Sequence, residues 1–426
     1  MGFTDFTSAL RNRAVRRTWL SQIISIVGDT TAWVGANVLV FQNTHSSFDI
    51  AVLNALTFAA WLGPAQVLTA AVARLPRLPV MIATDVIRAL LFVVMVIPGM
   101  PLLGFLGLYF FAMCNAPVFE CTRSALMVDI TPPEELSPAL SLMNSTSQAG
   151  ALLGFAFGGA LVALIAPREL LVVNATTFVV SALLLAGIRV PAAQQVAAAP
   201  ASGTRSSLRR SARSLREPVV WRCVVLVVLM SLAISASETI TVVFATDQLH
   251  AEATAWVGIL AAAMPAGALL GIALMRHRQS GAGLMRTSVL VCLLCSAATA
   301  LLAPAARWVA LGVVLYALVG SMGLIMGPTS TLVTPRLPLR ERAAAWSVLR
   351  GLVRGGELVG ALAAGMLATR VSPGVALSVC CAPIAVAAAA FALRPLPGLR
   401  FATRAASTVL EPEVVEAPLE AFAPLP

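Results

Sequence analysis

Ionisable side chains within apolar stretches are the residues of this chain that could do chemistry. A charged group at the centre of a bilayer costs roughly 2.5–3.5 kcal/mol on insertion scales, so each one needs a partner or a function. Asp29 lies midway along one apolar stretch, and Glu238 lies in the corresponding part of the second half of the chain. Carboxylates in such places can load and release protons, and we expect the two to flank one cavity. The alternative for Asp29 is a structural role, accepting hydrogen bonds from neighbouring helices.

A second group of charges lies near the carboxyl end of the apolar region. Arg350, Arg354 and Glu357 are spaced by four and three residues, which places them on one face of a helix. Pairing between Arg354 and Glu357 would lower the cost of burying both. Arg350 would then be free to attract an anion or to anchor a gate on the cytoplasmic side. Its alternative is an interfacial position from which the side chain extends to the cytoplasm.

Charges near predicted helix ends form the third group. Arg123 with Asp129 or Asp85 is typical of a gate cluster close to the cytoplasmic face, whereas Glu120 is deeper and could take part in proton movement. The predicted cavity residues are Asp29, Glu120, Glu238, Arg350, Arg354 and Glu357. The predicted cytoplasmic gate residues are Arg74, Arg77, Asp85, Arg88, Arg123 and Asp129.

Aromatic side chains could line the same cavity and form an apolar surface for a bulky ligand, or they could simply pack in the core or against lipid. The candidates are Trp33, Phe58, Trp61, Phe119, Phe155 and Phe157.

Enzyme chemistry and resident cofactors are not expected. His45, His250 and His277 are spread over separate loops, so no nucleophile with a base and no metal-ligand set can be assembled. Cys292 and Cys295 form a CxxC, but it lies inside an apolar run where packing is the better interpretation. There is no G-x-x-x-x-G-K-[ST] motif to bind ATP. We therefore expect no metal and no cofactor.

Composition indicates which elements must hold these residues. Of 426 residues, 59% are hydrophobic and 11% charged, against roughly 25% charged in soluble domains. The net charge of +10 comes from arginines lying between apolar segments, which does not favour nucleic-acid binding. A membrane-spanning helix needs about 20 residues, and Pro, Gly and charge clusters divide the chain into twelve such stretches. They lie at about 18–42, 50–73, 79–98, 102–130, 138–165, 170–190, 219–245, 253–275, 285–303, 308–333, 343–369 and 375–393.

Arginine placement predicts the orientation of these spans. The arginines concentrate in both tails and in alternate loops, so we expect those parts and both termini in the cytoplasm. The resulting parts are an amino-terminal six-helix half (1–190), a basic linker (191–217), a second six-helix half (218–394) and a disordered cytoplasmic tail (395–426). The predicted fold is all-α, with twelve transmembrane helices in two pseudo-symmetric halves.

An internal repeat relates the two halves. A shift of 206 residues aligns the segment from Arg123 with the segment from Thr329 without a gap, and Pro132 then matches Pro338. Glycines match as well: Gly150, Gly154 and Gly159 meet Gly356, Gly360 and Gly365. The halves are therefore expected to be parallel repeats. Small residues spaced by four allow helices to approach closely in lipid, so these glycines are predicted to be packing positions.

Two repeated six-helix halves joined by a basic loop resemble the major facilitator superfamily. Within it, GDTTAWVGANVLVFQ, DVIRAL, FECTRSALMVDITPPEEL and LLGFAFGGALVAL are similar to the branch of enterobactin-type siderophore exporters and macrolide efflux pumps. This resemblance implies a monomeric secondary transporter that works by alternating access and moves a small molecule, with export as its direction.

One loop departs from the family pattern. Where the superfamily usually has G-x-x-x-D-R-x-G-R-R, this chain reads TAAVARLPRL; Arg74 and Arg77 match, but Ala73 replaces the aspartate. In the family that aspartate helps to close the cytoplasmic side. The latch is therefore expected to be weakened, or rebuilt from Asp85, Arg88, Arg123 and Asp129.

These observations lead to one hypothesis and its alternatives. The hypothesis is proton-coupled export of a hydrophobic or amphiphilic small molecule, such as a drug, siderophore or natural product, across a bacterial inner membrane. The expected partners are the substrate, protons and the lipid bilayer. The alternatives are an uptake permease or lipid-type flippase, and a non-transporting receptor or scaffold descended from a transporter.

Overall fold

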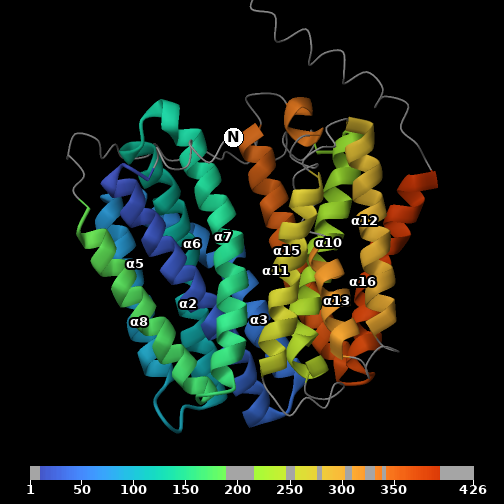
Figure 1. Ribbon diagram of the computed structural model, residues 1–426, viewed down its shortest axis with the longest axis horizontal. Coiled ribbons are helices and arrows are strands. Elements are labelled where there is room, and N and C mark those ends of the chain that lie inside the picture. Colours follow the sequence, from blue (N-terminus) through green and yellow to red (C-terminus); the bar gives the residue numbers. More distant parts are fainter. Residues whose placement is uncertain are drawn as a thin grey trace, which may run out of the picture.

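The protein folds as a bundle of long helices. The computed structural model describes residues 10–188, 215–245, 255–275, 281–302, 309–321, 332–337 and 342–393, and these residues contain helices and no strand. Figure 1 shows the helices side by side along one direction. Apart from residues 215–217, the expected linker lies outside the described residues, as does the expected tail.

Residues 10–188 of the first half contain seven helical segments, and proline begins several of them because the first turn needs no backbone N–H bond. Asn12 caps the first helix, its side chain accepting from the amides of Ala14 and Val15. The segments are α2 (Arg13–Thr44), α3 (Ser47–Leu62), α4 (Pro64–Val72), α5 (Arg77–Met95), α6 (Leu102–Ile130), α7 (Pro133–Val162) and α8 (Pro167–Ala186).

The second half repeats this pattern in its described parts. Its helices are α10 (Pro218–Val243), α11 (Ala255–Met275), α12 (Gly281–Leu302), α13 (Val309–Gly320), α15 (Arg342–Ala368) and α16 (Pro373–Leu393), with a short 3₁₀ turn, Thr334–Arg336, before α15. Each of the twelve expected spans therefore contains a helix. Among the described residues, seven helices are long and apolar enough to cross a membrane alone, and the bent pair α3–α4 makes up to eight.

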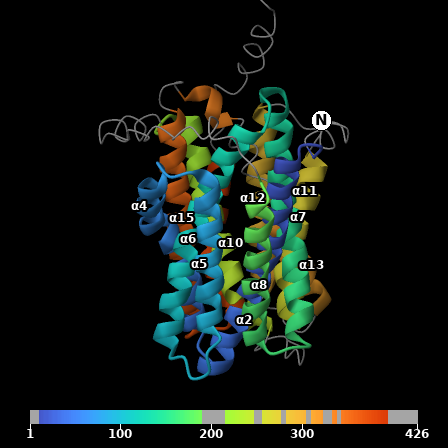
Figure 2. The same cartoon turned by 90° about the vertical axis from the view of Figure 1, so that its left-hand side faces the viewer.

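The span expected at 50–73 is not one straight helix. It is broken between α3 and α4, which are bent by 42°. The physical cause is Pro64, which lacks an N–H and disfavours helical geometry in the residue before it; Gly63 there has φ −144° and ψ −64°. Figure 2 shows α4 at the edge of the bundle, where it packs against α6.

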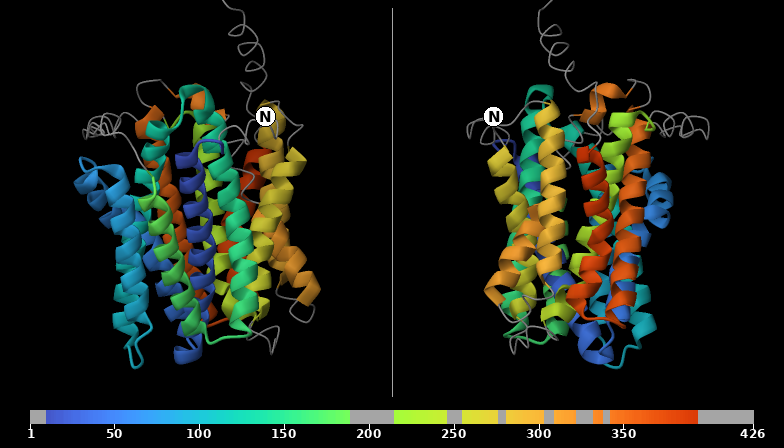
Figure 3. Two further views of the ribbon diagram at one scale, coloured as in Figure 1. Left: turned by 60° about the vertical axis from the view of Figure 1, so that its left-hand side comes forward. Right: turned by 90° about the vertical axis from the view of Figure 1, so that its right-hand side faces the viewer.

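The helices form two groups with α3 between them (Figure 1). One group contains α2 and α5 to α8, and the other contains α10 to α16. The two views of Figure 3 show each group in turn, with its helices running along the same direction. Across the groups, α3 packs on α15 and α7 packs on α11.

Glycines at matching positions allow close helix contacts within each half. In the first half α7 packs on α2, where a β-carbon at Gly154 would lie 2.9 Å from the Val27 carbonyl oxygen. In the second half α15 packs on α10, where a β-carbon at the matching Gly360 would overlap the Leu232 carbonyl oxygen. The predicted packing role of these repeated glycines is confirmed.

Another matched glycine pair faces the opposite half instead. Gly159 of α7 meets Gly258 of α11, and Gly365 of α15 meets Ala51 of α3. The Ser47 hydroxyl donates to the Gly365 carbonyl at 3.3 Å. These contacts lie at the end of the bundle where α2 ends and α3 begins, so backbone packing holds the halves together there.

Candidate functional site

A pocket of about 240 Å³ lies between the two halves. The first half provides most of its wall, from α2, α3, α5, α6 and α7, and α10 of the second half contributes Glu238. Both acidic residues expected to flank one cavity, Asp29 and Glu238, line it. The full lining is Asp29, Thr30, Ala32, Trp33, Asn54, Thr57, Phe58, Trp61, Arg88, Phe92, Tyr109, Met113, Ala116, Phe155 and Glu238.

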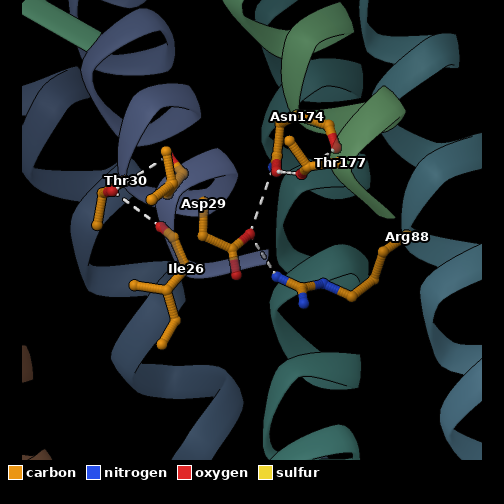
Figure 4. A network of polar contacts seen from close by, with 7 residues as sticks. Ile26, Asp29, Thr30, Arg88, Asn174 and Thr177 are labelled. Atoms are coloured by element: carbon orange, nitrogen blue, oxygen red, sulfur yellow. Dashed lines mark hydrogen bonds and ion pairs between the residues drawn. The ribbon is translucent and has the colours of Figure 1, made fainter. Parts of the chain in front are cut away.

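Asp29 forms an ion pair with Arg88 across α2 and α5. The Arg88 Nη2 donates to Asp29 Oδ1 at 2.7 Å, and Asn174 of α8 approaches the same oxygen through its Nδ2 at 3.3 Å. Figure 4 shows the Asp29 carboxylate directed toward both. The Arg88 side chain is 3% exposed and that of Asp29 is 33% exposed, so the carboxylate is the more accessible partner.

The surroundings hold this ion pair in position. The Arg88 guanidinium lies 4.1 Å from the ring centroid of Phe178, a favourable cation–π distance. Thr177 donates to Asn174 Oδ1 at 3.1 Å, which fixes the orientation of the amide (Figure 4). Gly28 leaves space for both, because a β-carbon there would overlap Asn174 and Thr177.

Asp85 is a buried carboxylate one turn before Arg88 on α5. Its Oδ2 accepts from the Ser181 hydroxyl at 2.6 Å, while its Oδ1 and the Arg88 Nε have no hydrogen-bond partner among the described residues. Buried polar atoms of this kind usually bind ordered water. Asp85 and Arg88 thus lie with Asp29 in the interior of the first half, away from the expected gate cluster. Sequence spacing alone could not show whether Asp85 and Arg88 lie at the cytoplasmic gate or in the interior of the first half.

At the expected cytoplasmic face, Asp129 pairs with Arg77 and not with Arg123. The Arg77 Nη1 also donates to the Ala125 carbonyl at 3.0 Å, so α5 and α6 are joined at this end. Arg123 instead interacts electrostatically with Glu120, one turn earlier on α6. Arg74, in the loop before α5, is exposed.

The expected pair on α15 is present. Arg354 donates to Glu357 Oε2 at 2.8 Å. Its guanidinium also lies 4.4 Å from the ring centroid of Trp61 on α3, so this side chain reaches across to the first half. Arg350 lies one turn earlier, exposed and within electrostatic reach of Cys121 on α6.

The aromatic expectation holds for part of the set. Trp33, Phe58, Trp61 and Phe155 line the pocket. The rings of Trp33 and Phe155 meet edge to face, with 5.4 Å between their centroids. Phe119 packs in a separate core cluster, and the Phe157 side chain is 49% exposed and does not line the pocket. Phe92 and Tyr109 line the pocket without having been predicted. Phe92 lies one turn after Arg88, which was assigned to the gate, and Tyr109 lies in an apolar run.

Sequence reasoning also missed a buried amide network at the pocket wall. The Trp33 indole N–H donates to Asn54 Oδ1 at 2.8 Å, Asn54 Nδ2 donates to Asn37 Oδ1 at 2.9 Å, and Asn37 Nδ2 donates to the Trp33 carbonyl at 2.8 Å. The network joins α2 to α3 and fixes the Trp33 ring. The sequence feature that could have indicated this network is the presence of two asparagines, Asn37 and Asn54, within apolar helices.

A multi-pass helical bundle with a polar and aromatic pocket between two repeated halves defines the class of secondary membrane transporters. The sequence profile of the Major Facilitator Superfamily matches residues 18–360. The chain belongs to this superfamily, and its fold is the twelve-helix major facilitator fold. No curated protein sequence matches the chain significantly.

Solved structures support the fold at low sequence identity. The crystal structure of the nucleoside transporter NupG aligns with a TM-score of 0.69 at 13% identity, covering 89% of this chain and 98% of that one. A bacterial homologue of the human lysosomal transporter Spinster, inward-facing and occupied, aligns with a TM-score of 0.68 at 15% identity, covering 90% and 96%. The POT family transporter PepTSo gives 0.68 at 11% identity, covering 90% and 97%. These likenesses concern the fold alone.

Proposed function

We propose that this protein is a proton-coupled exporter of a hydrophobic or amphiphilic small molecule in a bacterial inner membrane, working as a monomer by alternating access. The observation that carries the proposal is the pocket between the halves, where apolar and aromatic walls surround the Asp29–Arg88 pair. Such walls suit an apolar ligand, and a small number of polar groups orient it.

Proton coupling is assigned to Asp29. The carboxylate is bound by Arg88 and Asn174 through one oxygen, while a third of its side chain is exposed to the pocket. Protonation would neutralise its charge and weaken the bond to Arg88, since the charge-assisted contact needs the carboxylate. The pocket therefore has two states, one with Asp29 ionised and bound to Arg88 and one with Asp29 protonated. Binding of substrate or of a proton would favour one state over the other.

The pocket is proposed to open toward the cytoplasm in this conformation. The halves pack backbone to backbone at the α2–α3 end, through Gly159 with Gly258 and Gly365 with Ser47. Arginine placement assigns that end to the outside. Alternating access then requires these contacts to separate while the cytoplasmic ends approach.

The cytoplasmic gate is proposed to depend on Arg77 and Asp129, whose ion pair stands near the position of the missing loop aspartate. Arg74 and Arg123 would add positive charge around it. Glu120 and Arg350, both exposed on α6 and α15, would line the entrance to the pocket from the two halves. Asp85 and Arg88 act deeper, beside Asp29.

Efflux measurements test the proposed function. A pump-deficient host producing the chain is loaded with dyes, antibiotics and siderophores, with and without a protonophore. We expect efflux of at least one compound, lost with the protonophore and with Asp29→Asn, and retained with the control Asp49→Asn. The siderophore and macrolide branch of the family guides the choice of compounds. If cells that produce the protein took up more of a compound than control cells, the protein would be an uptake permease. If no compound moved although the protein is present in the membrane, a non-transporting receptor or scaffold would be favoured.

A further inference from the structure

The charges around the pocket do not balance. Asp29 is paired with Arg88 and Glu357 is paired with Arg354, so each of these two arginines already has an acidic partner. Glu238 lines the pocket and forms no ion pair or hydrogen bond with any described residue. The charged groups within electrostatic reach of Glu238 are Glu357 and Arg354, which neutralise one another. One carboxylate therefore faces the pocket without a cation.

Packing between α10 and α15 fixes this arrangement. The Ser235 hydroxyl donates to the Glu357 carbonyl at 2.7 Å, and the Ser231 hydroxyl donates to the Val353 carbonyl at 3.0 Å. Glu238 follows Ser231 and Ser235 by seven and three residues, so these contacts hold the face of α10 that carries it against α15, at the border of the pocket. Its position is set by the backbone packing and not by a counter-charge of the protein.

The part of the pocket wall that the first half provides is suited to a cation as well. Aromatic ring faces attract cations, and the attraction strengthens when water is excluded. Two such contacts already occur beside the pocket, with Arg88 over Phe178 at 4.1 Å and Arg354 over Trp61 at 4.4 Å. Further rings, all from helices of the first half, line the same cavity as Glu238.

We propose that Glu238 is the binding partner of a positively charged group on the transported molecule, and that the ligand class is a monovalent organic cation with an apolar or aromatic body. This inference rests on the proposed function and specifies its substrate. A neutral ligand would leave the carboxylate buried without a partner, and an anionic ligand would add a second negative charge beside it. Both outcomes cost free energy that a cation avoids.

Equilibrium binding to the purified full chain tests the charge of the ligand directly. The probes are tetraphenylphosphonium, a cation, and triphenylphosphine oxide, a neutral molecule of related shape. Quenching of tryptophan fluorescence reports binding, because Trp33 and Trp61 line the pocket. We expect the cation to bind at least about tenfold more tightly than the neutral probe, which corresponds to about 1.4 kcal/mol.

Variants assign that preference to one residue. Glu238→Gln should bring the two affinities to within about twofold, Glu238→Asp should retain part of the preference, and Glu169→Gln, an exposed acid in the first turn of α8, should behave as the unaltered protein. Thermal melting confirms that each variant is folded. Equal binding of the two probes, binding of neither, or a preference unchanged in Glu238→Gln would overturn the inference. Efflux of a neutral compound alongside such a result would leave the transporter proposal standing.

Discussion

Arg88 and Asp29 face one another across α5 and α2, with 2.7 Å between the Arg88 Nη2 and the Asp29 Oδ1. The arginine is buried and the carboxylate borders the pocket, so the pair joins the packing of the first half to the space where a ligand would bind. Because a buried charge needs its partner, any event that alters the carboxylate also alters the hold on the arginine.

Removing one member of this pair should destabilise the protein. Arg88→Met leaves the Asp29 carboxylate without its cation, and since Asp29 is partly exposed we expect a loss of about 2 kcal/mol rather than the larger values for full burial. The double variant Asp29→Asn with Arg88→Met should recover part of this loss. Thermal melting in detergent measures both. Equal destabilisation in the single and double variants would show that the ion pair itself is not important for stability.

The glycines on α7 and α15 provide a matched packing test. Gly158→Ala should lower stability by about 1–3 kcal/mol, because the new methyl would lie 2.9 Å from the Thr31 Cα and the helices must separate. Gly355→Ala should be neutral or stabilising, since nothing lies within 4 Å of its β-position and alanine favours helix. Chemical or thermal unfolding of the two variants decides the point, and a similar effect of both would contradict the helix contacts described here.

Closure of the halves at the α2–α3 end can be followed with a thiol reagent. In a Cys121→Ser background, which removes the exposed cysteine, Ser47→Cys should react slowly with an impermeant maleimide added outside intact cells. Adding Gly365→Leu should increase labelling several-fold, because a side chain there meets the Ser47 carbonyl oxygen at 2.9 Å and keeps the halves apart. Labelling only from the cytoplasmic side would contradict the assigned orientation.

The amide network behind Trp33 should matter for stability and for binding. Asn54→Leu leaves the Trp33 N–H and the Asn37 amide without their partners, at about 1–3 kcal/mol for each buried group. It should also weaken ligand binding, since the Trp33 ring loses its fixed orientation. Asn43→Leu is the control, because Asn43 bonds only an exposed carbonyl of its own helix. Melting curves and probe binding of the two variants give the comparison.

Much of the fold could be predicted because its signals are local. Apolar stretches, bounded by prolines and arginines, indicated the twelve spans, and the repeat from Arg123 placed Gly154 with Gly360 in equivalent contacts. The break at Gly63–Pro64 was also encoded locally, but the hydrophobic run continues through it and conceals the bend.

Pairing between helices could not be predicted in the same way. The Arg354–Glu357 pair was predicted correctly because both residues lie on one helix at a fixed spacing. Asp29 with Arg88 joins different helices, so its partner depends on how α2 and α5 are packed and rotated. The same dependence placed Arg77, and not Arg123, beside Asp129.

The most direct test of proton-coupled export is transport by inside-out membrane vesicles containing the full chain. Respiration acidifies the vesicle interior. We then measure two quantities, the uptake of labelled tetraphenylphosphonium into the vesicles and the release of protons from their interior. For proton-coupled export we expect accumulation that a protonophore abolishes, accompanied by proton release, with both absent in Asp29→Asn and both retained in Asp49→Asn. Accumulation and proton release unchanged in Asp29→Asn, or depletion of the probe in place of accumulation, would contradict it.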